Sequence, residues 1–158
     1  MSYEAPILNE VWLHLKNNDC LENEGDFDMV VETPKVLSDY KIACNSHDIN
    51  KIVSFFADDC VLEDVARGIV KHGKKEVTDS FNSMFVEFPD LKYELMTVYG
   101  VGNWACIECA MSGTHGSKPF SFRAASIFQL SNGEIIHESS YWNVMTYLQQ
   151  VGLMPKQP

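Results

Sequence analysis

Hydrophobic residues at helical spacing indicate two consecutive short helices in residues 36–56. In the first helix the apolar side chains recur at steps of three and four residues and share one face: Val36, Leu37, Tyr40 and Cys44. The run Ser46-His47-Asp48 breaks this pattern, and Asp48 is suited to cap the amino end of a second helix. That helix has its own apolar stripe, formed by Ile49, Ile52, Val53 and Phe56.

An extended run follows the second helix. We expect Asp58-Asp59 to form a loop, after which the side chains alternate as in a β-strand. This alternation places Cys60, Leu62 and Asp64 on one face. A carboxylate on an apolar face, and the phenol of Tyr40 on the apolar face of its helix, are the groups that a buried acid–base site requires.

The remaining chain predicts a longer helix and a series of long strands. Arg67-Gly68 predicts a turn, Ile69-Val70 a short strand, and Gly73 precedes a helix that ends at Pro89-Asp90. The apolar stripe of this helix consists of Val77, Phe81, Met84, Phe85 and Phe88. Strands are predicted over residues 91–99, 104–114, 120–130 and 134–142, with turns or loops at 100–103, 115–119 and 132–133.

This order of elements predicts an α+β fold. A final helix over residues 144–151 ends at Gly152. A meander of long strands curls around the helices that precede it, so we expect a cone with a mostly antiparallel sheet wrapped around three helices. The mouth of such a cone is a natural pocket. We expect residues 34–158 to form this domain, and residues 1–33 to form a helical extension, with a short amphipathic helix that packs on the outside, on a partner subunit or as a lid.

Composition and charge narrow the classes of ligand. With 158 residues the chain suits one domain, and Asp and Glu outnumber Lys and Arg 22 to 12, for a net charge of −10. Binding to phosphates requires clustered cations, so this balance argues against nucleic acid and anionic membrane surfaces as partners. No apolar run approaches a membrane span, and no signal peptide is evident, so we expect a cytoplasmic protein.

Metal and cofactor signatures are not found in the sequence. The five cysteines show no disulfide spacing, and Cys106 and Cys109 fall in a predicted strand at a separation that sends them to opposite faces. No phosphate-binding glycine loop or metal-spaced histidine cluster occurs. We therefore expect a site without metal or cofactor. Glu108 falls on the opposite face of the same strand from Cys109, where a dimer contact and a pocket role both remain open.

The run DYKIACNSHDINKIVSFFADDCVLEDV, residues 39–65, resembles the opening of bacterial steroid delta-isomerases. These enzymes belong to the nuclear transport factor 2-like (SnoaL-like) superfamily, whose fold is a cystatin-like cone. The tail SGTHGSKPFSFRAASIFQLSNGEIIHESSYWNVMTYLQQVGL is similar to SnoaL-type polyketide cyclases, and together the two matches cover roughly Lys35 to Leu153. The resemblance implies that Asp64 is a general base and Tyr40 an oxyanion-hole donor, without a gap between them. It also implies a homodimer formed through the convex face of the sheet.

Two positions depart from the family pattern. Steroid isomerases pair the tyrosine with a protonated aspartic acid, and that position falls here on Ser126, a weaker donor that costs about 3 kcal/mol of transition-state stabilisation. SnoaL-like cyclases carry an acid ahead of the last helix, where this chain has Asn143, which suits an N-cap. His115 matches part of the G-T-H-x-G loop and has a pKa range suited to proton transfer.

The sequence leads to one main hypothesis and one alternative. We expect an enzyme of the isomerase or lyase type that moves a proton alpha to a carbonyl, with Asp64, Tyr40 and Ser126 as catalytic residues. The hydrophobic substrate would contact Phe56, Leu62, Phe85, Phe88, Met111, His115, Phe122, Trp142 and Asn143. The alternative is a non-catalytic small-molecule binding or interaction module on the same scaffold.

Overall fold

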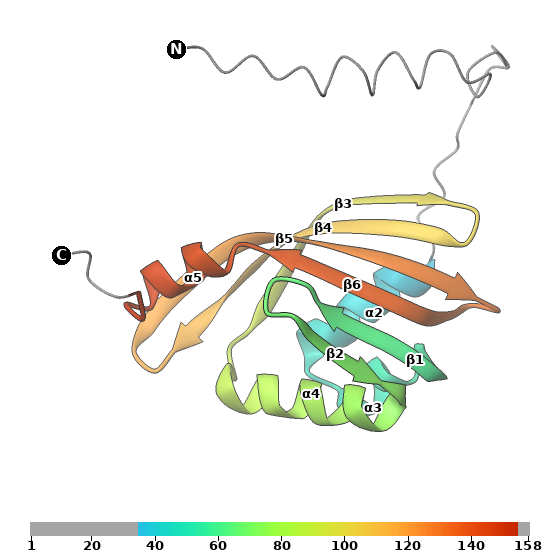
Figure 1. Ribbon diagram of the computed structural model, residues 1–158, viewed down its shortest axis with the longest axis horizontal. Coiled ribbons are helices and arrows are strands. Elements are labelled where there is room, and N and C mark those ends of the chain that lie inside the picture. Colours follow the sequence, from blue (N-terminus) through green and yellow to red (C-terminus); the bar gives the residue numbers. More distant parts are fainter. Residues whose placement is uncertain (1–34, 155–158) are drawn as a thin grey trace, which may run out of the picture. The chain divides into compact units, whose positions relative to one another are not determined.

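The computed structural model describes residues 35–154 (Figure 1). The chain divides into two units, Met1–Val30 and Val31–Pro158, and the described residues belong to the second. Four helices and six strands follow in the order α2 (Lys35–Ser46), α3 (Ile49–Val53), β1 (Phe56–Asp64), β2 (Ile69–His72), α4 (Gly73–Glu87), β3 (Lys92–Val101), β4 (Trp104–His115), β5 (Lys118–Ser131), β6 (Glu134–Trp142) and α5 (Val144–Gln150). The amphipathic helix predicted within residues 1–33 lies outside the described residues.

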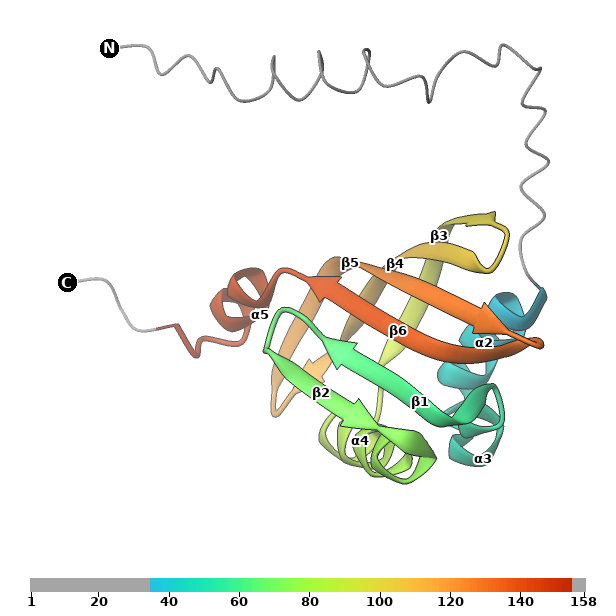
Figure 2. The same ribbon diagram turned by 45° about the vertical axis from the view of Figure 1, so that its right-hand side comes forward.

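The six strands form one sheet in the order β2-β1-β6-β5-β4-β3. Every neighbouring pair is antiparallel except β1 and β6, which are parallel. Figures 1 and 2 show the sheet curling over α2, α3 and α4, with α5 following the end of β6. The expected α+β cone with a mostly antiparallel sheet is thus confirmed.

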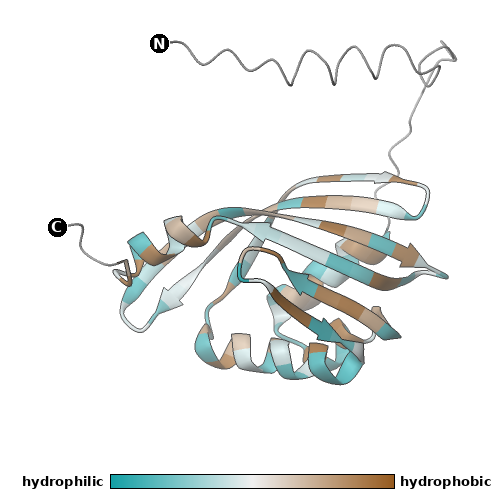
Figure 3. Ribbon diagram, in the orientation of Figure 1, coloured by the Kyte–Doolittle hydropathy of each residue, from teal (hydrophilic) through white to brown (hydrophobic). Residues whose placement is uncertain are grey.

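The core lies between the concave face of the sheet and the helices. The largest side chains that are almost fully buried include Tyr40, Phe56, Phe128, Ile107 and Ile135. Figure 3 shows hydrophilic or neutral colours along most of α4, because its outer residues face solvent while Val77 and Phe81 pack inward. Burial of these side chains stabilises the fold by about 1.5–3 kcal/mol each.

Local signals placed several boundaries correctly. The Asp48 carboxylate accepts a hydrogen bond from the backbone N–H of Lys51 at 3.0 Å, so it caps α3 as predicted. Asn132 and Gly133 have φ angles of 51° and 81°, which is the left-handed pair that a two-residue hairpin requires. Strand β6 also begins and ends at the predicted residues, Glu134 and Trp142.

Four predictions about boundaries are wrong. The turn predicted over residues 100–103 shrinks to Gly102-Asn103, because β3 runs to Val101, which pairs with Trp104. Asp58-Asp59 belongs to β1 rather than to a loop, and Phe56 begins that strand instead of completing the stripe of the second helix. The predicted loop over residues 115–119 shrinks to Gly116-Ser117, because His115 and Lys118 pair across β4 and β5. Cross-strand pairing extends these strands into polar residues, and the register shift between Phe56 and Val61 lets exposed Asp58 lie within β1.

Candidate functional site

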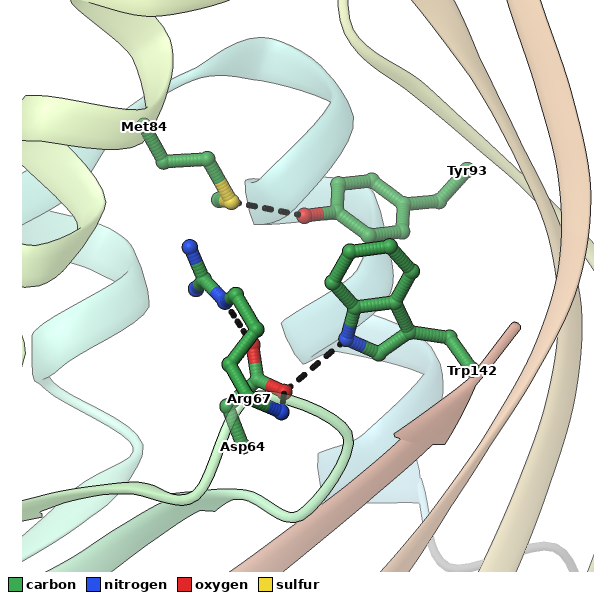
Figure 4. A network of polar contacts seen from close by, with 5 residues as sticks. All are labelled: Asp64, Arg67, Met84, Tyr93 and Trp142. Atoms are coloured by element: carbon green, nitrogen blue, oxygen red, sulfur yellow. Dashed lines mark hydrogen bonds and ion pairs between the residues drawn. The ribbon is translucent and has the colours of Figure 1, made fainter. Parts of the chain in front are cut away.

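Asp64 lies at the end of β1 with its carboxylate held by two neighbours (Figure 4). The indole N–H of Trp142 donates to Oδ1 at 2.9 Å, and the backbone N–H of Arg67 donates to the same oxygen at 3.1 Å. The Nε of Arg67 donates to Oδ2 at 2.6 Å, and the Asp64 side chain keeps 18 % of its surface exposed. The carboxylate is therefore oriented and still reachable from solvent.

Strand pairing and a tight turn create this arrangement. Asp64 lies opposite Ser140 in the parallel β1–β6 pair, and Trp142 follows two residues later on the same face of β6. Gly68, with φ of 66°, closes the turn after β1, and Arg67 folds back over Asp64. The guanidinium carbon of Arg67 lies 5.9 Å from the centre of the Trp142 ring, within the range of a cation–π contact.

Tyr40 has a different set of partners from Asp64. Its hydroxyl donates to Oε2 of Glu138 at 2.8 Å, and its side chain is 2 % exposed. Four phenylalanine rings surround it edge-on with centres 5.6–6.5 Å away: Phe55, Phe56, Phe81 and Phe128. Burial, and next the nearby Glu138 carboxyl, raise the pKa of Tyr40 well above 10.

Glu138 is a buried carboxyl that the sequence reasoning missed. It is 3 % exposed, and its Oε1 accepts a 3.3 Å hydrogen bond from the hydroxyl of Ser140, which in turn lies 3.1 Å from the hydroxyl of Ser126. A buried polar chain thus runs from Tyr40 through Glu138 and Ser140 to Ser126. The signal for it was strand parity, because Glu138 alternates onto the same face of β6 as Ser140 and Trp142.

Tyr93 is a second residue that the sequence reasoning missed. Its hydroxyl points to the sulfur of Met84 at 3.6 Å (Figure 4), and a thioether is a weak acceptor. Burial raises the pKa of Tyr93 well above 10. The amine of Lys41 lies 5.0 Å from the centres of both the Tyr93 and Tyr40 rings. The hydroxyl of Tyr93 therefore has a much weaker hydrogen-bond partner than that of Tyr40, which donates to a carboxyl group.

Five of the predicted substrate contacts are half-buried apolar side chains that pack against the core: Leu62, Phe85, Met111, Phe122 and Trp142. Trp142 stacks on Phe122 with ring centres 5.0 Å apart. Phe56, in contrast, is 0 % exposed and packs inside the core.

Phe88, His115 and Asn143 lie in or next to a second cluster around α5. The Tyr147 hydroxyl and Nδ1 of His115 are 2.8 Å apart and share a hydrogen bond, and Phe88 packs edge-on against both rings. The other ring nitrogen of His115 lies 3.9 Å from the Glu87 carboxylate. Asn143 accepts from the Thr146 backbone N–H at 3.0 Å and caps α5, as its N-cap interpretation predicted.

Two open depressions lie on the surface of the described domain, one next to Trp142 and one next to Tyr93. One of about 560 Å³ runs from Trp142 and Asn143 to Glu108 and Arg123, which form an ion pair on the opposite face of the sheet. The second, of about 390 Å³, is lined by residues of α2, β3, β4 and β5. The predicted outward position of Glu108 is thus confirmed, whereas these hollows differ from the pocket expected inside the cone.

The described residues, 35–154, hold free thiols but no metal-binding cluster. In this part of the chain no three His, Cys, Asp or Glu side chains are arranged to hold a metal ion. Cys44, Cys60, Cys106 and Cys109 are free thiols, and Cys109 is buried while Cys106 is half-buried. Burial raises the pKa of the Cys44 thiol to about 12, so it is unreactive at neutral pH. Within the same residues no helix has the length and apolar character to cross a membrane.

A mostly antiparallel sheet that curls around helices is the fold of the nuclear transport factor 2-like superfamily, to which the SnoaL-like proteins belong. The family model for SnoaL-like polyketide cyclases matches residues 34–151, and the chain belongs to that family. No curated protein sequence matches the chain.

Solved structures share the fold at low sequence identity. A Catenulispora acidiphila protein with a ketosteroid isomerase-like fold, in complex with trimethylamine, has a TM-score of 0.72 and 21 % identity over 80 % of this chain and 99 % of its own. Wild-type IdmH from Streptomyces antibioticus has a TM-score of 0.68 and 17 % identity, covering 77 % and 99 %. An M. tuberculosis LEH-like epoxide hydrolase has a TM-score of 0.67 and 15 % identity, covering 77 % and 90 %. At these identities the likeness establishes the fold alone.

Proposed function

We propose that this protein is a cofactor-independent enzyme of the isomerase or cyclase type that transfers a proton alpha to a carbonyl of a hydrophobic small molecule. Asp64 is the general base in this proposal. The observation that carries it is the position of the Asp64 carboxylate, which is oriented by Trp142 and Arg67, where Trp142 stacks on Phe122 and both rings pack against the core. A fixed carboxylate beside an apolar surface is the arrangement that proton abstraction from carbon requires.

The reaction needs no redox partner. The Asp64 carboxylate takes the proton from the carbon next to the carbonyl, and the electron pair of that C–H bond moves into the enolate. The proton then returns to another carbon of the same ligand. The enolate oxygen requires a donor, and the Tyr93 hydroxyl supports this role because its partner in the described region is only the Met84 thioether.

The roles predicted for Tyr40 and Ser126 stay predictions. The Tyr40 hydroxyl already donates to Glu138, and the Ser126 hydroxyl shares a hydrogen bond with Ser140. For either group to donate to an enolate, the buried chain through Glu138 must rearrange. Glu138 would then provide the carboxyl group that steroid isomerases have at the position of Ser126.

The test is turnover of a β,γ-unsaturated ketosteroid or a smaller β,γ-enone by wild type and Asp64→Asn. Loss of the base is expected to lower kcat about a hundredfold or more. Glu63→Gln is the matched control, because Glu63 precedes Asp64 in β1 but accepts from Ser139 on the other face. Inactive wild type, or an Asp64→Asn variant as active as wild type, refutes the assignment.

The second candidate function is a non-catalytic binding or dimeric interaction module. It is supported by the two partners that already occupy the Asp64 carboxylate and by exposed apolar side chains on the convex face of the sheet: Tyr99, Val101, Trp104, Ile127 and Tyr141. Self-association through this face would bury them in a homodimer. Sedimentation of Ile127→Glu against wild type tests the dimer, and ligand binding without turnover would favour this candidate.

A further inference from the structure

Arg67 uses only part of its hydrogen-bonding capacity on Asp64. Its ion pair with Asp64 engages Nε, and among residues 35–154 the two terminal nitrogens have no side-chain partner. Figure 4 shows the end of the guanidinium extending away from the Asp64 carboxylate toward Met84. Arg123 makes a contrasting pair on the opposite face, where it turns a terminal nitrogen onto Glu108.

The surroundings of the guanidinium are flat and apolar. The Trp142 ring lies 5.9 Å from the guanidinium carbon, and Figure 4 shows the Arg67, Trp142, Tyr93 and Met84 side chains converging from different elements. Trp142 and Phe122 continue this surface as a stacked pair. A molecule bound by Arg67 would therefore place its apolar part against the Trp142 and Phe122 rings.

The fork of a guanidinium matches the two oxygens of a carboxylate. We propose that Arg67 recognises a carboxylate on the ligand, and that the ligand is a flat apolar carbonyl compound carrying this single negative group. This inference rests on the proposed function, because it names the substrate class of the Asp64 site.

Recognition by Arg67 would also prepare the base. The ligand carboxylate at the two terminal nitrogens and the Asp64 carboxylate at Nε compete for the charge of one guanidinium, so a bound ligand weakens the hold of Arg67 on Asp64, which keeps its hydrogen bond from Trp142. The side chain of Arg67 is 54 % exposed, which gives it room to move. The net charge of −10 opposes an anion at long range, but salt screens that repulsion beyond about 8 Å at physiological ionic strength.

The competition makes an unusual prediction for Asp64→Asn. Removing the internal carboxylate frees Arg67, so this variant is expected to bind a carboxylate ligand more tightly while its turnover is lost. A purely structural ion pair predicts no gain in binding. The two readouts thus move in opposite directions in one variant.

The experiment uses the full chain and three probes that share one ring system: 2-naphthoate, its amide, which is close to it in shape, and its methyl ester. Binding is measured by calorimetry, and the indole N–H signal of Trp142 reports whether the probe occupies this site. We expect 2-naphthoate to bind about tenfold or more tightly than the two neutral probes. We expect Arg67→Gln to remove this preference, Arg67→Lys to retain part of it, and Arg123→Gln to leave it intact.

Equal affinity for the three probes, an unchanged preference in Arg67→Gln, or no detectable binding of 2-naphthoate would overturn the inference. The measurements also distinguish a failure of the proposed function from a failure of this inference. Carboxylate binding through Arg67 without turnover of any enone would refute catalysis and leave the inference standing. Turnover of neutral enones without any preference for the carboxylate probe would support catalysis and refute the inference about Arg67.

Discussion

Replacing Tyr40 with phenylalanine removes one hydroxyl and keeps the ring. The packing of this ring against Phe56, Phe81 and Phe128 is retained, so the change isolates the 2.8 Å hydrogen bond to Glu138. Because that bond is buried and its acceptor is a carboxyl, we expect the free energy of unfolding to fall by about 1.5–3 kcal/mol. For a domain of this size the melting temperature should fall by about 5–12 °C.

The assay is urea and thermal unfolding of Tyr40→Phe, Glu138→Gln and the double variant. A coupling energy of about 1 kcal/mol or more between the two positions is expected from a direct contact. Tyr99→Phe is the matched control, since Tyr99 is 60 % exposed and its hydroxyl should contribute less than about 0.5 kcal/mol. A loss in Tyr40→Phe as small as in the control would refute the buried pair.

The same variant decides which tyrosine faces the ligand. If Tyr93 is the oxyanion donor, Tyr40→Phe keeps its kcat on a β,γ-enone while Tyr93→Phe loses about a hundredfold. If Tyr40 is the oxyanion donor, as the resemblance to steroid isomerases implies, Tyr40→Phe loses about a hundredfold in kcat and Tyr93→Phe keeps its kcat. Stability measured in parallel separates a loss of fold from a loss of chemistry.

The remaining predictions concern pH and the last helix. Because burial raises the folded-state pKa of Tyr40 and Tyr93 well above 10, their contribution to stability is present below about pH 10 and is lost as pH rises further, by up to about 1.4 kcal/mol per pH unit for each tyrosine. Alkaline urea titration should show this loss, with a shallower slope in Tyr93→Phe; equal slopes would contradict it. Cys44, whose pKa rises to about 12, adds a loss that begins near pH 9, and Cys44→Ser tests it by the same titration. Asn143→Ala should destabilise the protein by about 1 kcal/mol through loss of the cap on Thr146, whereas Asn143→Asp should not, as chemical denaturation can verify. Equal stability of the alanine and aspartate variants would show that the cap contributes nothing.

Much of the fold was readable from the sequence because its signals are local. The periodicity of 36–44, the caps at Asp48 and Asn143, and the Asn132-Gly133 hairpin depend on residues a few positions apart, and each was placed correctly. Asp58-Asp59 was misassigned because this polar run lies in the register shift of β1, between Phe56 and Val61, whose pairing with β6 on both sides keeps the strand continuous.

The partners of each functional group were decided only by the tertiary structure. Sequence alone put Tyr40 and Asp64 on inward faces, but it could not show that Tyr40 meets Glu138, 98 residues away, or that Asp64 meets Trp142, 78 residues away. Those contacts arise from the parallel pairing of β1 with β6 and from the curl of the sheet over α2. Periodicity fixes the direction in which a side chain points, whereas the group it meets depends on how distant segments pack.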